Sequence, residues 1–98
     1  MFARTTTLFF KPEKIDEGVN IYATSVIPAA RSQKGFRMAT LLLDRKTSKA
    51  MSITFWETEA DAEANEENLY YQDQLVKFLS IYSAPPVREG YEVAVDSR

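Results

Sequence analysis

The feature that most constrains this chain is the segment from Met51 to Asn65, where a strand pattern changes directly into a helix pattern. Apolar and polar residues alternate through Ala50–Glu57, which predicts a strand that ends at Trp56, the only tryptophan of the chain. Thr58 and Asp61 have the spacing of a capping box, in which the threonine hydroxyl accepts a hydrogen bond from the first helical turn. The segment therefore predicts a β–α unit with Trp56 at its corner.

The N-terminal part predicts a strand followed by a helix. Met1–Phe10 is rich in Thr and Phe and holds no helix breaker, which is typical of a strand. Pro12 suits the first turn of a helix, because no hydrogen bond needs its missing N–H there. Pro28 predicts a kink near the end of that helix, since an interior proline clashes with the preceding turn. Gly35 predicts where the helical region stops.

The centre of the chain predicts an antiparallel hairpin. Its strands are Phe36–Asp44 and Ala50–Glu57, and the polar residues Arg45–Lys49 join them. Three consecutive leucines, Leu41–Leu43, break the alternation expected of a strand with one face in water. We therefore expect both faces of this sheet to be covered.

The C-terminal part predicts a second helix and a last strand. A break is expected between Asn65 and Asn68, and a second helical segment follows it. Ala84–Pro86 ends this segment, because the residue before a proline is driven out of the helical conformation. Val87–Val95 predicts the last strand, with Gly90 as a candidate β-bulge. The apolar arc of the second segment comprises Tyr71, Leu75, Phe78 and Tyr82.

The order strand, helix, strand, strand, helix, strand is that of a ferredoxin-like split βαβ fold. We expect one α+β domain over residues 1–98, with a four-stranded antiparallel sheet and both helices on one face. The other face keeps many apolar residues and has nothing left in the chain to cover it. A homodimer with two-fold symmetry through that open face is the expected solution.

The composition excludes several classes of function. The chain has no cysteine and no histidine, which excludes thiol nucleophiles, Ser-His-Asp sites and zinc sites built from Cys and His. A net charge of −2 with scattered basic residues argues against nucleic-acid binding. No apolar run reaches the ~18 residues that a membrane helix needs. A cytoplasmic protein with no metal and no cofactor is expected.

Several short motifs resemble the antibiotic biosynthesis monooxygenase (ABM) domain of the dimeric α/β-barrel superfamily. They are Trp56-Glu-Thr followed by Glu-Ala-Asp-Ala, Ile27-Pro-Ala-Ala-Arg31 before Gly35-Phe36, and the Leu-Leu-Leu-Asp44 strand with its polar hairpin. Their order and spacing carry the resemblance, which runs over nearly the whole chain, from Arg4 to Val95.

The resemblance implies a homodimer whose sheets pack face to face, with a small cavity between the sheet and helices of each subunit. Some members of the family oxidise anthrone-type substrates to quinones with molecular oxygen and no metal or flavin. Others degrade haem with a helix histidine that has no counterpart here, and of their site only Trp56 can be carried over. A cofactor-independent monooxygenase for a small aromatic or polyketide-like molecule is thus implied. The alternative is a non-catalytic dimer that binds a small hydrophobic ligand or serves only in assembly.

The candidate catalytic residues are Trp56, Arg4 and Tyr71. The Trp56 indole can stack on a planar substrate and donate its N–H, although an ordinary core residue also fits this corner. Arg4 shares a strand face with Thr6. If that face meets the helices, Arg4 is a buried cation suited to a phenolate or enolate; if it meets a partner sheet, an ion pair with Glu89 is expected.

The remaining candidates are aromatic residues and one threonine. A phenol hydroxyl can hold a substrate oxygen or relay a proton, while tyrosines at helical spacing are also common in cores. None of these groups is an obvious base near neutral pH. The expected substrate-binding residues are Thr6, Tyr22, Tyr70, Phe55 and Tyr82.

Overall fold

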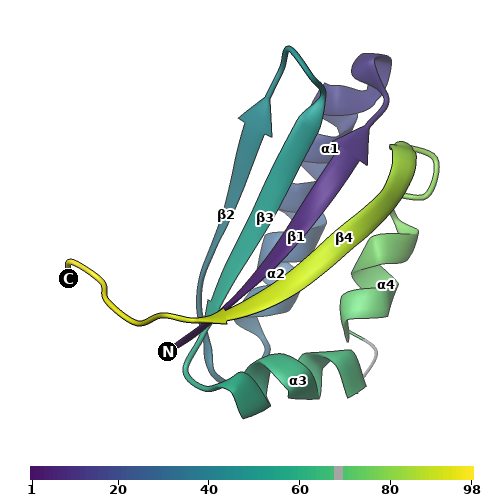
Figure 1. The fold of residues 1–98 in the computed structure, drawn as a ribbon. Helices are drawn as coiled ribbons and strands as arrows, with labels where there is room; N and C mark the ends of the chain where they lie inside the picture. Colours follow the sequence, from purple (N-terminus) through teal and green to yellow (C-terminus); the bar gives the residue numbers. More distant parts are fainter. Residues whose placement is uncertain (68–69) are drawn as a thin grey trace.

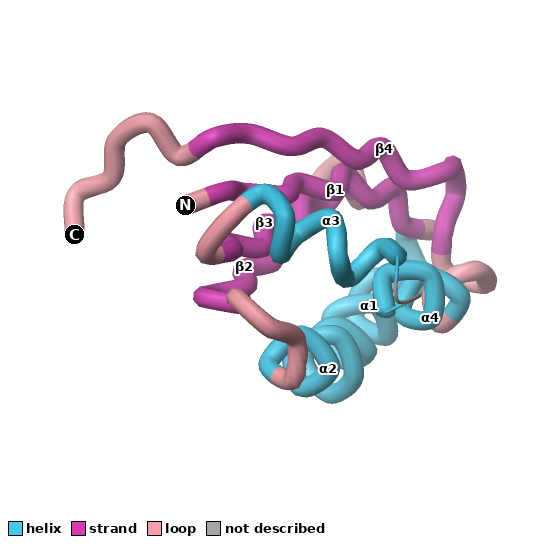
Figure 2. Tube along the Cα trace, turned by 90° about the horizontal axis from the view of Figure 1, so that it is seen from below, coloured by secondary structure: helices cyan, strands magenta, loops and turns pink. Residues whose placement is uncertain are grey.

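The computed structural model describes the backbone of residues 1–67 and 70–98, and the side chains of residues 1–64 and 72–98. One antiparallel sheet has the strand order β2-β3-β1-β4, and the helices lie on one side of it (Figures 1 and 2). This confirms the expected α+β fold. The strands are β1 Phe2–Phe10, β2 Phe36–Asp44, β3 Lys49–Trp56 and β4 Tyr82–Glu92. The helices are α1 Ile15–Ile21, α2 Ile27–Arg31, α3 Glu59–Glu67 and α4 Tyr70–Val76, with a 3₁₀ turn η1 Pro12–Lys14 and a π-helical turn η2 Tyr22–Val26.

The strand register gives the sheet two different faces. Residues directly opposite each other on neighbouring strands point to the same side. Thr6 lies opposite Ser52 of β3 and faces the helices; this side is called the covered face. Leu42 lies opposite Met51 of β3, and their side is called the open face. About half of the area of four large side chains on the open face is exposed, namely Met38, Leu42, Val87 and Tyr91.

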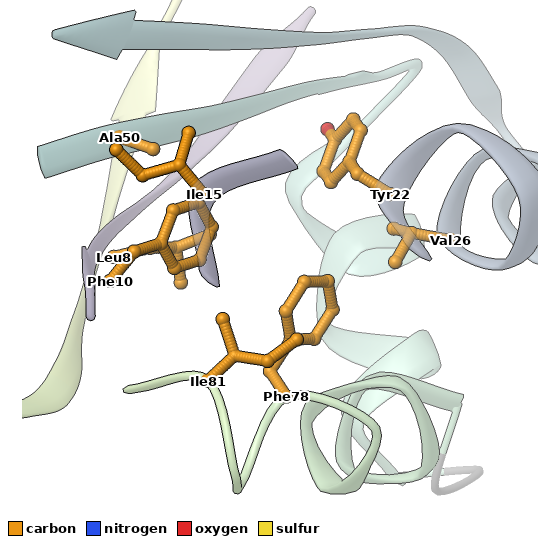
Figure 3. Packing of buried hydrophobic residues seen from close by; sticks show 8 residues of the cluster. All are labelled: Leu8, Phe10, Ile15, Tyr22, Val26, Ala50, Phe78 and Ile81. Atoms are coloured by element: carbon orange, nitrogen blue, oxygen red, sulfur yellow. The ribbon is translucent and has the colours of Figure 1, made fainter. Parts of the chain in front are cut away.

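The main core lies between the covered face and the helices (Figure 3). Phe10 of β1 is 1% exposed and stacks on Phe78, with ring centroids 6.3 Å apart. Gly18 of α1 allows this packing, because a Cβ there would lie 3.0 Å from the tip of the Phe10 ring. Burial of each such side chain contributes roughly 1.5–3 kcal/mol. The buried members of this core are Leu8, Phe10, Ile15, Tyr22, Val26, Ala50, Phe78 and Ile81.

The first helical region contains a π-turn instead of a kink at Pro28. In η2 the N–H of Ile27 bonds to the carbonyl of Tyr22, one residue farther back than in an α-helix. A continuous α-helix would press the Pro28 ring against the carbonyl of Thr24, and the wider turn avoids this clash. Pro28 then occupies the first turn of α2, where its missing N–H costs little. Gly35 follows with φ of +80°, as expected of the residue that ends the region.

The corner at Trp56 is as expected. β3 ends at Trp56, and the N–H of Asp61 bonds to the Thr58 hydroxyl at 3.1 Å, so the predicted cap is present. The next helix, α3, continues to Glu67, so residues 65–67 are helical and this part of the predicted break is wrong. α4 begins at Tyr70, and Asn68, the end of the predicted break, lies outside the described residues.

The predicted boundary between the last helix and the last strand is wrong. α4 ends at Val76, and β4 begins at Tyr82 rather than Val87. The reason is long-range pairing: the carbonyl of Ile81 accepts a hydrogen bond from Lys11 at 2.8 Å, and Tyr82 lies opposite Phe10. The prolines of β4 are tolerated because β4 is an edge strand.

Gly90 is not a bulge. It pairs regularly with Arg4, and the register shifts of β1 and β4 lie farther along, between Thr7 and Phe10. A Cβ on Gly90 would instead lie 2.6 Å from Nη1 of Arg4 and 2.7 Å from the ring tip of Phe2. The glycine therefore gives the Arg4 side chain room to cross β4.

Candidate functional site

A cavity of about 60 Å³ lies between the covered face and the helices. The sheet supplies its floor and the helical side supplies most of its walls. Its polar groups gather on the floor, while the walls are mainly apolar, which is the usual composition of a small-molecule site. The floor residues are Arg4, Thr6, Leu8, Ser52, Thr54 and Trp56. The walls are Tyr22, Val26, Gln74, Leu75, Phe78 and Tyr82.

Arg4 brings a positive charge to this floor. Its guanidinium carbon lies 5.3 Å from the centroid of the Phe2 ring, a distance typical of a cation–π contact. Of the two arrangements considered from the sequence, the structure has the one in which Arg4 faces the helices. Glu89 lies opposite Thr5 and therefore belongs to the open face.

Trp56 forms the end of the cavity and is 1% exposed. Its ring packs edge-on against Phe36, with centroids 5.7 Å apart. The indole N–H donates a hydrogen bond of 2.9 Å to Oγ1 of Thr54, and that hydroxyl in turn lies 3.5 Å from the carbonyl of Arg4. The N–H of Trp56 is thus used within the protein, so the indole offers the cavity an apolar wall.

Tyr22 extends from η2 to the sheet. It is 4% exposed, and its hydroxyl shares a hydrogen bond of 2.8 Å with Oγ of Ser52 and can donate to the carbonyl of Thr40 at 3.4 Å. Burial raises the pKa of the Tyr22 phenol, and the hydrogen bond with Ser52 lowers it by less. Tyr22 is therefore a neutral phenol at neutral pH, able to donate a hydrogen bond but not to serve as a base.

One hydrogen bond crosses the rim between two helical elements. The Ser25 hydroxyl of η2 donates to Oε1 of Gln74 in α4 at 3.0 Å. This bond links the two helical walls of the cavity. Neither residue was predicted from the sequence, because their proximity depends on how the helices pack.

The predicted site residues divide into three groups. Arg4, Thr6, Tyr22, Trp56 and Tyr82 all line the cavity. Phe55 lies opposite Ala3 on the open face, so it belongs to the other side of the sheet. The backbone of Tyr70 and Tyr71 begins α4, but their side chains lie outside the described residues.

Ser52 and Thr54 were missed, although the sequence held a signal for them. They precede Trp56 by four and two residues on the same strand, and residues at this spacing share one face of a strand. Glu57, which follows Trp56, is exposed and pairs with Arg37 at 2.9 Å, so it does not belong to the cavity.

Two negative findings apply to the described part of the chain. No group of three acidic side chains there could hold a metal ion. None of the helices described has the length and apolar character that crossing a membrane requires.

Comparisons with known proteins give distant relatives and many similar folds. No family model matches the chain. Two uncharacterized proteins from two strains of Mycobacterium tuberculosis are 27% identical over 99 aligned residues, which cover the whole of this chain. The chain spans 43% of the length of these relatives.

Three solved structures illustrate the similarity of fold. A Nitrosomonas europaea protein of unknown function has a TM-score of 0.82 and 19% identity, over 99% of this chain and 92% of its own. A structure of an antibiotic biosynthesis monooxygenase has a TM-score of 0.78 and 16% identity, over 97% of this chain and 100% of its own. SnoaB, a cofactor-independent oxygenase from Streptomyces nogalater solved as a mutant, has a TM-score of 0.76 and 11% identity, over 97% of this chain and 94% of its own.

Proposed function

We propose that this chain, which has the fold of antibiotic biosynthesis monooxygenase structures, is a cofactor-independent monooxygenase for a small aromatic or polyketide-like substrate. The shared fold confirms the resemblance seen in the sequence at the level of architecture. The observation that carries the proposed activity is the cavity, which combines a guanidinium and a row of hydroxyls on its floor with apolar walls. The cofactor-independent oxygenase among the similar structures supports the same chemistry.

The proposed reaction uses the substrate as its own source of electrons. Val26, Leu75 and Phe78 contact the faces of the ring, and the hydroxyl groups of the floor bind its oxygen atoms. The deprotonated substrate reacts with O2 at a ring methylene. One oxygen atom remains as the new carbonyl, and the other leaves as water with the two hydrogens of the methylene.

Arg4 stabilises the substrate anion. A guanidinium within about 4–6 Å of an acidic group lowers the pKa of that group by about 1–3 units. Tyr22 is excluded as the base, because burial raises the pKa of its phenol. The proposal therefore requires a substrate acidic enough to ionise beside Arg4 without a protein base among the described cavity residues.

Oxygen uptake tests this function. The purified chain in metal-free buffer is given a panel of anthrones, which carry the ring methylene that the reaction requires, and consumption of one O2 per molecule of new ketone formed is expected. Arg4→Gln is expected to lower kcat/KM about 100-fold or more, as loss of one charge-stabilising donor commonly does. Arg45→Gln is the control, because Arg45 is an exposed arginine of the turn between β2 and β3 and does not line the cavity. Absence of oxygen uptake across the panel rejects the activity.

Trp56→Phe tests the role of the indole separately. The smaller ring is expected to lower kcat because the wall against which the substrate packs recedes. An unchanged rate would remove Trp56 from the site and leave it as a core residue at the corner.

The size of the cavity favours a second candidate, a non-catalytic protein that binds a small hydrophobic ligand. A volume of about 60 Å³ is well below that of an engineered cavity of ~150 Å³ that holds benzene. A polycyclic substrate therefore requires the walls to move apart. Saturable binding of panel molecules without oxygen uptake would favour this candidate over the enzyme.

The open face supports a homodimer as part of the same proposal. Met38, Leu42, Val87 and Tyr91 form an apolar surface on one side of the sheet, and such surfaces mark interaction sites. Two copies packed through this face would bury these side chains. Light scattering at micromolar concentration is expected to give twice the mass of the chain, and a monomer would reject the dimer. A cytoplasmic location also belongs to this proposal.

A further inference from the structure

The hydrogen-bonded pair of Tyr22 and Ser52 joins a helical wall of the cavity to its floor. Tyr22 comes from η2 and Ser52 from β3, and both line the cavity. Their oxygen atoms lie 2.8 Å apart, and the Tyr22 hydroxyl points from the helix toward the strands (Figure 3). The carbonyl of Thr40 is a second acceptor for Tyr22, at 3.4 Å. These positions allow two arrangements of the hydroxyl hydrogens.

In the first arrangement, Tyr22 donates to the Thr40 carbonyl and Ser52 donates to Tyr22. Ser52 then offers only lone pairs to the cavity, because a hydroxyl has a single hydrogen. In the second arrangement, Tyr22 donates to Ser52, and the hydrogen of Ser52 is available to the cavity. The same oxygen atom can thus accept a hydrogen bond from a ligand or donate one to it.

Thr54 differs from this pair. Its Oγ1 already accepts the Trp56 N–H at 2.9 Å, and its hydrogen has the Arg4 carbonyl as a partner at 3.5 Å. Among the described residues, no second acceptor is placed to redirect that hydrogen as Thr40 does for Tyr22. Burial, which raises the pKa of Tyr22, keeps the Tyr22–Ser52 pair neutral, so it can change arrangement without charging the site.

We infer that Ser52 is the ligand-contacting hydroxyl of the cavity and that Tyr22 positions it, so that one site binds a ring oxygen both as a hydroxyl and as a carbonyl. The ligand class is a small cyclic ketone with a ring methylene, bound in its enol form, and the product in which that oxygen is a carbonyl. This inference rests on the proposed function in one respect: only the proposed oxidation converts the ring oxygen from a hydroxyl to a carbonyl. The binding preference itself requires no oxidation.

The test uses three ligands of similar size that the proposed reaction does not oxidise. Phenol can donate and accept a hydrogen bond, anisole can only accept one, and toluene can do neither. Affinities are measured by NMR titration of the whole chain. Because a hydrogen bond is worth about 1 kcal/mol, the wild type is expected to bind phenol and anisole about fivefold more tightly than toluene.

The variants separate contact from positioning. Ser52→Ala is expected to abolish the two preferences, which are the tighter binding of phenol over toluene and of anisole over toluene, and to leave the affinity for toluene unchanged. Tyr22→Phe is expected to reduce both preferences by about half of their fold value, and the double variant is expected to match Ser52→Ala. Ser52→Thr restores a hydroxyl and is expected to recover the preferences. Ser32→Ala is the control, because Ser32 is an exposed serine in the turn after α2 and does not line the cavity.

Three outcomes would overturn the inference. They are preferences that survive Ser52→Ala, additive losses in the double variant, and a wild type that binds none of the ligands. An unchanged affinity for toluene shows that the cavity of a variant is intact. Where a variant has lost its affinity for toluene, Ser52→Thr is used in its place. If phenol and anisole bind more tightly than toluene but no oxygen uptake is seen, the monooxygenase activity is rejected and the role of Tyr22 and Ser52 in binding stands. If oxygen uptake is seen but the three ligands bind equally, only the role of Tyr22 and Ser52 is rejected.

Discussion

In an ordinary half-buried sheet the covered face is apolar and the open face is polar. In this sheet the middle of the covered face is polar, and the open face carries large apolar side chains. The middle of the covered face carries Arg4, Thr6, Ser52 and Thr54, although helices enclose it. The open face carries Met38, Leu42, Val87 and Tyr91, each about half exposed.

This difference shows what each face is suited to contact. The hydroxyl and guanidinium groups of the enclosed floor can form hydrogen bonds, so the floor is suited to a ligand with oxygen atoms. Large exposed apolar residues are suited to another protein surface. Because side chains alternate along a strand, a shift of one residue in register would exchange the two faces. The four predictions below test the contrast.

The largest expected effect separates two neighbours on β3. Trp56→Ala removes the largest fully buried side chain and is expected to lower the free energy of unfolding by about 3–5 kcal/mol. Phe55→Ala, on the open face, is expected to cost clearly less in a single chain. Urea denaturation of both variants measures the difference, at a protein concentration below the dimer dissociation constant so that no second copy buries Phe55. Equal losses would contradict the contrast between the faces.

The second prediction addresses the open face. Leu42→Glu places a charge within the proposed dimer interface and is expected to weaken self-association at least 100-fold, or about 2.7 kcal/mol. Leu79→Glu is the matched control, because Leu79 is 68% exposed and lies in the turn before β4. Sedimentation equilibrium gives both dissociation constants. If the two variants associate equally well, the dimer does not use this face.

The third prediction concerns Gly90, which makes room for Arg4. In Gly90→Ala the new Cβ meets the flexible end of Arg4 and the ring tip of Phe2, so both side chains must shift and the expected loss of stability is about 1–3 kcal/mol. Binding of 4-nitrophenolate, an anionic ring, is expected to weaken about tenfold. Gly18→Ala provides the reverse control, since its Cβ meets the core ring of Phe10 and is expected to reduce stability without changing the affinity. Unchanged 4-nitrophenolate affinity in Gly90→Ala would remove Arg4 from anion binding.

The smallest expected effect is a pH dependence from Tyr22. Burial raises the pKa of this phenol above its ordinary value of 10.0, so the folded chain holds the proton after the unfolded chain has lost it. The stability that this proton contributes is therefore complete below pH 10 and is lost as pH rises through the folded pKa. Tyr22→Phe is expected to lose less unfolding free energy between pH 9 and 11 than the wild type. Parallel slopes in urea denaturation would contradict this.

The fold was predictable because its strands and helices differ in hydrophobic period. The start of β4 was not, since Tyr82 follows Phe78 at helical spacing while its actual partner is Phe10, far away in the sequence. Local spacing cannot report such a pairing. The π-turn was not predicted either. Pro28 correctly indicated that the helix could not continue regularly, but the spacing of residues does not show which irregular turn avoids the clash.

Most of the cavity residues that were predicted from the sequence are large or charged. Arg4, Thr6, Tyr22, Trp56 and Tyr82 all reach the cavity. Phe55 was included although it follows Thr54 by one residue and must therefore face away. Ser52 was omitted because a serine on a strand is unremarkable until the partner of its hydroxyl is known.

The π-turn η2 also determines how this cavity can change during evolution. It contains one residue more than the α-helical turn that it replaces. Deletion of one codon for an exposed residue such as Ala23 would remove that extra residue and let the turn close as an α-helix, so the segments before and after it would keep their orientation. The Pro28 ring would then meet the carbonyl four residues earlier, which is the clash that the wider turn avoids. The extra residue and Pro28 therefore depend on each other, and this wall of the cavity is expected to change only when both change together.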